Sequence, residues 1–114
     1  MVDMDRARRL LSAEESDTRE LIRSLSSVIH DLSAAREGDN SDDEHDPEGS
    51  TLAFERSQTD TLLRQAEERL TSIAEAVARL DDGTFGICTN CGNPIAEVRL
   101  EVRPYAATCV ACAG

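Results

Sequence analysis

Residues 52–80 read LAFERSQTDTLLRQAEERLTSIAEAVARL, and this stretch decides the fold. Along it, residues that are mostly apolar recur first after seven positions and then alternately after four and three positions. This is the repeat of a helix that packs along one stripe against another helix. The stripe consists of Leu52, Thr59, Leu63, Ala66, Leu70, Ile73, Val77 and Leu80. We therefore expect a helix over about residues 51–80. Ser50 or Thr51 would cap it, because a hydroxyl can accept the free amide hydrogens of a first helical turn.

A second helical segment lies upstream, over about residues 3–36, where the sequence contains no Pro or Gly. Its apolar stripe is less regular and is interrupted by the polar Glu14 and Thr18. The stripe residues are Leu11, Leu21, Leu25, Val28, Leu32 and Ala35. Asp3 or Asp5 would stand near the start of this helix. Ser12 followed by Glu15 matches a capping box and leaves open a break there.

Between the two segments, residues 37–50 read EGDNSDDEHDPEGS, which contains seven acids and the helix breakers Gly38, Pro47 and Gly49. We interpret this stretch as a turn that reverses the chain, so that the two stripes face each other in an antiparallel coiled-coil hairpin. The same stripes could instead pair between two chains, and this alternative stays open at the level of sequence.

All four cysteines lie in the last segment, residues 81–114, as two CxxC pairs. Cys88 and Cys91 form the first pair, and Cys109 and Cys112 form the second. This spacing is typical of two knuckles that close a tetrahedron of thiolates around one Zn²⁺. Gly92 directly after Cys91 allows a positive φ, which lets the backbone turn its amides toward sulfur. Four thiolates leave no open position for an activated water, so we predict a structural zinc. A redox dithiol pair and an iron centre are the alternatives.

Charge and composition exclude several functions. The 114 residues carry a formal net charge of −11, which opposes phosphate binding, so we expect no direct sequence-specific DNA binding. No apolar run is long enough to span a bilayer and no signal peptide is visible, so we expect a cytoplasmic protein without membrane contact. There is no nucleophile–base set and no phosphate loop, so we expect no enzymatic activity.

Residues 80–112, LDDGTFGICTNCGNPIAEVRLEVRPYAATCVAC, resemble the zinc finger of the DksA/TraR family of transcription regulators. The shared features are the GTFGxCxxCG entry at residues 83–92, Ile95, the RLE triplet at residues 99–101, Pro104 and the closing CxxC pair. Members of this family place a coiled-coil hairpin before the finger. The resemblance therefore implies a mainly α fold: a hairpin over residues 1–80 and a C4 zinc finger over residues 81–114.

The resemblance further implies an RNA polymerase accessory protein whose hairpin enters the secondary channel and carries acids at its tip toward the catalytic Mg²⁺. Two alignments of the tip compete. The DxxD spacing of the family selects Asp43 and Asp46, whereas counting back from Cys88 selects Glu48. All three are candidate tip acids, with Asp46 and Glu48 preferred; the alternative is that the acidic run is only a solvated turn.

Two departures from the family limit what is carried over. The sequence ends two residues after Cys112, without the C-terminal helix of many members, so we do not expect a response to ppGpp. The tip is longer and more acidic than is usual in the family, so the resemblance does not indicate whether the protein activates or inhibits transcription or competes with other factors that enter the channel. A zinc-stapled coiled-coil adaptor or homodimer without a polymerase role is the alternative function, although we expect a monomer.

Overall fold

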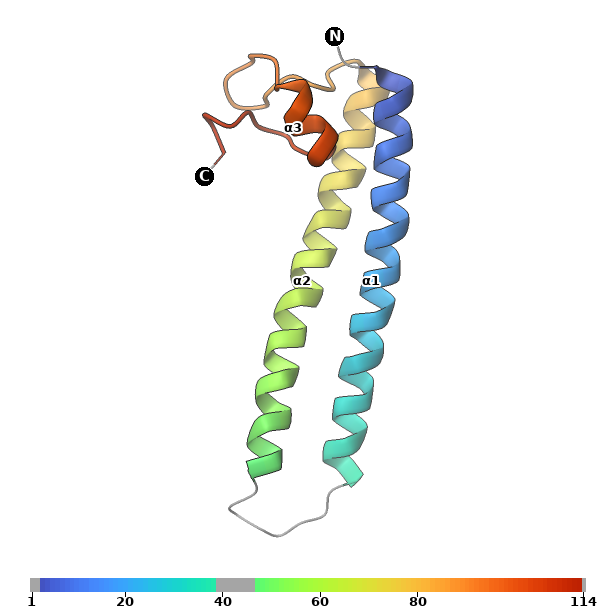
Figure 1. Cartoon of the computed structure of the whole chain (residues 1–114), viewed down its shortest axis with the longest axis vertical. Helices are drawn as coiled ribbons and strands as arrows, with labels where there is room; N and C mark the ends of the chain where they lie inside the picture. The colour runs from blue at the N-terminus through green and yellow to red at the C-terminus, as the bar shows by residue number, and fades with distance from the viewer. Residues whose placement is uncertain (1–2, 39–46, 114) are drawn as a thin grey trace.

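The computed structural model describes residues 3–38 and 47–113, and the side chains of residues 35–38 and 47–50 are left out of the description. Three helices are present in these ranges: α1 (Met4–Gly38), α2 (Pro47–Asp82) and α3 (Glu97–Val102). α1 and α2 run antiparallel along the length of the molecule, and α3 lies beside their upper ends (Figure 1). The rod measures 63 × 26 × 20 Å. The predicted mainly α hairpin followed by a four-cysteine finger is confirmed.

α1 begins where the sequence indicated. The Asp3 carboxylate accepts hydrogen bonds from the backbone N–H groups of Asp5 at 3.0 Å and Arg6 at 3.3 Å, which satisfies two of the free amides of the first turn. The helix then continues through Ser12 and Glu15 without a break, so the capping-box alternative is wrong. Gly38 ends the helix two residues later than predicted.

α2 begins four residues before the predicted position, at Pro47 rather than at residue 51. The sequence argument treated Pro47 as a breaker. A proline at the first position of a helix is favourable, however, because its φ already suits the helix and its missing N–H would have had no partner there. The predicted caps Ser50 and Thr51 therefore lie inside the first turns of the helix.

The seam between the two helices follows the prediction closely in α2 and only partly in α1. Every predicted stripe residue of α2 is buried or half-buried. In α1, Leu21 and Val28 are 40% and 43% exposed, and their neighbours Ile22 and Ile29 are the less exposed residues. Thr18, one of the two polar residues that interrupt the predicted stripe, is 1% exposed and is therefore part of the seam.

The finger shares a hydrophobic core with the upper end of the hairpin. From the hairpin this core takes Leu11 and Ile73, which are 0% and 1% exposed, and from the finger it takes Phe85 and Leu100, both 4% exposed. The remaining buried members are Ala7, Ala76, Cys88, Ile95 and Ala106. Packing against this core holds the finger at this end of the rod, which we call the foot although Figure 1 draws it at the top. Among the described residues, no helix is both long enough and apolar enough to cross a membrane.

Candidate metal centre

The chain enters the finger through a tight turn at the end of α2. The Asp82 carboxylate accepts hydrogen bonds from the backbone N–H and the hydroxyl of Thr84, and the first of these is 3.0 Å long. These hydrogen bonds hold the pKa of Asp82 below its ordinary value, the hydroxyl contributing most. Gly83 has a φ of 83°, a conformation that a side chain would strain. The turn ends α2 and delivers Phe85 into the shared core.

The first knuckle contains Cys88 and Cys91. Ile87 and Pro94 form an antiparallel bridge, and the Cys88 N–H donates to the Asn93 carbonyl at 2.8 Å, so the chain doubles back between them. Gly92 adopts a φ of 77° at the bend, as its position after Cys91 predicted. The Cys91 N–H points at the Cys88 sulfur, 3.5 Å away. This amide-to-sulfur geometry stabilises a thiolate ligand.

The second knuckle contains Cys109 and Cys112 and is tied to the rest of the finger by two contacts that the sequence did not predict. The Thr89 N–H donates to the Ala107 carbonyl at 2.9 Å, which joins the knuckles directly. The Arg99 guanidinium Nε donates to the Thr108 carbonyl at 2.9 Å, which joins α3 to the residue before Cys109. Arg99 thus positions the second knuckle.

Together the knuckles bring four sulfurs to one point. The Sγ atoms of Cys88, Cys91, Cys109 and Cys112 lie within 4.8 Å of one another, and those of Cys91 and Cys109 are 3.7 Å apart. A tetrahedron of sulfurs with Zn–S bonds of about 2.3 Å has edges of about 3.8 Å. The donor set and its spacing therefore fit one zinc ion.

The electrostatics of the four thiols show why a cation belongs among them. The backbone N–H of Cys91, followed by that of Cys109, lowers the pKa of Cys88 to about 6. The side chain of Asn90 lowers the pKa of Cys112, but the thiols of Cys109, Cys91 and Cys88 together raise it to about 11. Four such groups cannot all ionise side by side unless a cation neutralises their repulsion, which a divalent metal does.

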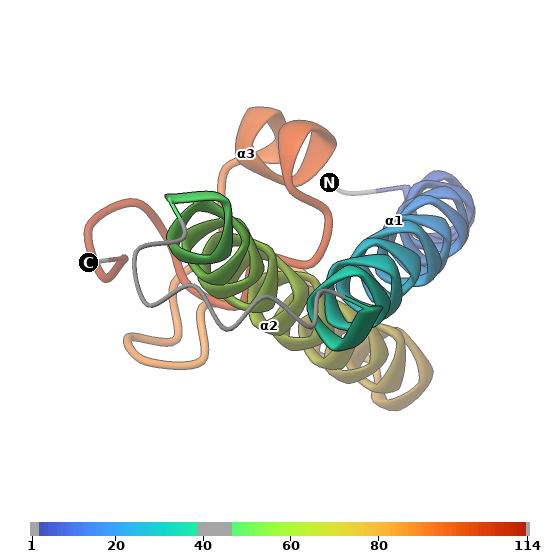
Figure 2. The ribbon, with the colours of Figure 1, turned by 90° about the horizontal axis from the view of Figure 1, so that it is seen from below.

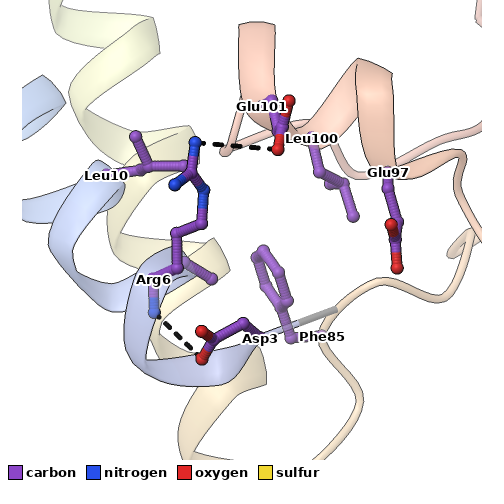
Figure 3. A pocket seen from close by; sticks show the side chains of 8 residues that line it. Asp3, Arg6, Leu10, Phe85, Glu97, Leu100 and Glu101 are labelled. Carbon is purple, nitrogen blue, oxygen red and sulfur yellow. Dashed lines mark hydrogen bonds and ion pairs between the residues drawn. The ribbon is translucent and has the colours of Figure 1, made fainter. Parts of the chain in front are cut away.

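A small cavity of about 130 Å³ lies nearby, between the start of α1 and α3 (Figure 3). Phe85 and Leu100 form its apolar floor, and an exposed ion pair between Arg6 and Glu101, 3.6 Å apart, lies at its edge. Pockets that take drug-sized ligands or nucleotides measure about 300–1,000 Å³. The cavity is a gap in the packing between finger and hairpin and is too small for such a ligand.

In the sequence, the predicted tip acids fall between α1 and α2 or at the start of α2. Asp43 and Asp46 fall outside the described residues. The backbone of Glu48 lies in the first turn of α2, which starts at Pro47. Gly38 and Pro47, the helix ends on either side of the joining segment, both stand at the far end from the finger (Figure 1).

A long helical hairpin closed at one end by a four-cysteine zinc finger defines the structural class of this protein. Residues 83–114 match the family described as the prokaryotic DksA/TraR C4-type zinc finger. The structure is similar to that of the transcription factor DksA2 from Pseudomonas aeruginosa, with a TM-score of 0.76 and 29% identity over 95% of this chain and 78% of that one. The finger of this chain is therefore of the DksA/TraR C4 type, the whole chain shares the fold of DksA2, and the four cysteines bind one structural zinc ion.

Two curated relatives extend the comparison. General stress protein 16O of Bacillus subtilis is 31% identical over 96 residues, which cover 84% of this chain and 53% of the relative. The RNA polymerase-binding transcription factor DksA of Caulobacter vibrioides is 42% identical over 55 residues, which cover 44% of this chain and 39% of the relative. The match thus spans about half or less of the length of these relatives.

Proposed function

We propose that this protein is a non-enzymatic regulator of transcription that binds RNA polymerase and inserts its hairpin into the secondary channel. The observation that carries the proposal is the arrangement of the rod: the zinc finger and shared core are at one end, and the helix ends that flank the acidic segment are at the other. The relative from Caulobacter is named as an RNA polymerase-binding transcription factor, which supports the choice of partner.

The proposed mechanism depends on the slim shape of the hairpin and on the chemistry of its tip. A rod of 63 × 26 × 20 Å is narrow enough to enter a pore that excludes a globular domain of the same mass. Asp43, Asp46 and Glu48 would supply the carboxylates at its end. Carboxylate oxygens are preferred ligands of Mg²⁺ and attract the water and basic side chains around it, so they would alter the catalytic centre of the polymerase.

The test uses the double variant Asp46→Asn plus Glu48→Gln with purified polymerase. Affinity for polymerase should stay within about twofold of wild type, since exposed charges contribute little to binding individually, while the effect on promoter-complex lifetime is lost. The matched control is Glu67→Gln plus Glu75→Gln, which removes the same charge from two exposed positions of α2 away from the tip. Equal regulatory activity of the tip variant and wild type would refute the assignment of the tip acids.

A further inference from the structure

The side of the hairpin that carries the finger continues past the finger as an uncovered face. At the foot, Leu10 of α1 lines the cavity under α3, and Ala76 of α2 is buried in the core that hairpin and finger share. Ala76 does not belong to the stripe that faces α1, so it marks the side of α2 on which the finger sits. These two residues give a reference for following the same side along each helix.

On α1 the finger side leads to two exposed apolar residues. Leu21 lies eleven residues after Leu10 and Val28 lies seven residues after Leu21, which are about three and two turns of an α-helix. All three side chains therefore lie on one side of α1. Leu21 and Val28 are 40% and 43% exposed, because the finger that covers Leu10 does not reach them.

On α2 the same side leads to Gln58, which precedes Ala76 by eighteen residues, or five full turns. Phe54 and Leu62 flank Gln58 by one turn each and are 63% and 51% exposed. Gln58 and Leu62 also line a shallow hollow together with Ser57 and Thr61. This part of α2 thus presents an uncharged surface on a helix that is otherwise rich in charge.

The pairing of the helices puts these residues side by side. Arg8 reaches Asp81 at 3.0 Å near the foot, and Arg56 donates to the Ser33 hydroxyl at 2.6 Å near the other end. These contacts fix the level at which α1 and α2 face each other, and they place Val28 opposite residues 61 and 62. Figure 2, seen along the rod, shows α3 on one side of the plane of the two helices. We call Leu21, Val28, Phe54 and Leu62 the finger-side stripe.

The charges around the finger-side stripe indicate what it would bind. Asp17 precedes Leu21 by about one helical turn, and Asp31 follows Val28 by about one turn. Glu55 is the residue after Phe54, and the basic Arg69 follows Leu62 by two turns, toward the finger. All four of these charged residues are exposed. The chain as a whole carries a formal charge of −11. A complementary surface has an apolar ridge flanked by lysine or arginine. A second copy of this chain would instead bring the same acids against each other, which opposes self-association through this face.

We propose that the finger-side stripe is the face of the rod that docks on RNA polymerase, through a helix of the enzyme with an apolar ridge and basic flanks. The inference rests on the proposed function and specifies which side of the hairpin makes the contact. An apolar centre with charged edges is the arrangement in which a few side chains carry most of the binding energy. Seating on this face would also set the rotation of the rod and hence the direction in which the tip acids point.

The test compares two double variants that leave the net charge unchanged. Val28→Gln plus Leu62→Gln removes apolar surface from the finger-side stripe. Ala53→Gln plus Ala74→Gln alters exposed residues on the opposite side of α2 and serves as the matched control. Fluorescence anisotropy with purified polymerase measures affinity, and thermal melting confirms that each variant is folded. We expect binding to weaken at least about tenfold for the stripe variant and less than about twofold for the control.

The outcomes separate this inference from the function on which it rests. If the wild-type chain does not bind polymerase, the proposed function fails and the docking face fails with it. If the wild-type chain binds and the stripe variant binds equally well, only the docking face is refuted. Sedimentation of the same samples tests whether a second copy of this chain occupies the face. A wild-type dimer that is lost in the stripe variant would assign the face to self-association and overturn docking on polymerase.

Discussion

The foot of the molecule and the far half of the hairpin are built from the same helices but are held together differently. At the foot, the helices, the finger and the zinc ligands share one core in which Leu11, Ile73 and Phe85 are almost completely buried. In the far half, residues 21–34 and 51–65, no described side chain is fully buried. A pair of helices alone encloses few side chains on all sides, whereas a third element packed across them encloses many more.

The comparison shows where stability and function are separated. Burial of apolar surface is the main stabilising contribution to a fold, so the foot should be the most stable unit and the far half the first to open. The far half is also the part that the proposed function inserts into the polymerase. A lightly packed rod anchored at one end suits a segment that must enter a channel.

Loss of the zinc site should have the largest effect on the difference in stability between the foot and the far half. Cys109→Ser, or chelation of zinc, should unfold the finger, because structural zinc supplies about 10 kcal/mol or more of folding free energy in peptide models. Phe85 and Leu100 would then leave the shared core. The backbone amides of the foot should therefore lose their greater protection from hydrogen exchange relative to those of the far half. Hydrogen exchange followed by segment measures this, with re-addition of zinc to the chelated wild type as the control. Unchanged protection of residues 85–112 after chelation would refute the zinc-dependent fold.

Truncation of seam residues should destabilise the hairpin more at the foot than in the far half. Ile73→Ala at the foot should cost about 2–5 kcal/mol, the usual range for a fully buried side chain. Leu25→Ala in the far half should cost roughly 1–2 kcal/mol, since a half-buried side chain loses less contact and leaves a site that water can fill. Urea denaturation followed by circular dichroism compares the two. Equal costs would show that the far half is as tightly packed as the foot.

The smallest expected effect is a gain in stability on substitution of Thr18, which lies on the border between the two regions. Its Oγ1 is buried without a hydrogen-bond partner among the described residues, which costs free energy that a methyl group does not. Thr18→Val should therefore stabilise the protein by about 1 kcal/mol. Thr59→Val is the control, because the Thr59 hydroxyl donates to the Glu55 carbonyl at 2.8 Å and its loss should bring no gain. Thermal unfolding of both variants measures the difference.

The stripe of α2 was predictable because its residues follow one register over its whole length. The stripe of α1 was predicted only in part. Leu11, Leu25 and Leu32 lie in the seam, but Ile22 and Ile29 take the places that Leu21 and Val28 were expected to fill. Both sets have helical spacing and similar hydrophobicity. The choice between them depends on how the partner helix is rotated, which a single segment does not encode.

By itself, the sequence determined the features that depend on short spacings along the chain. Two CxxC pairs define the zinc ligands because the residues of a knuckle are close in sequence, and Asp3 caps α1 because its partners are the next few amides. Only the tertiary structure decided that Ala7, Ala76 and Phe85 join one core and that Arg99 positions the second knuckle. These contacts link segments far apart in the chain, and the packing of the finger on one side of the hairpin selects them.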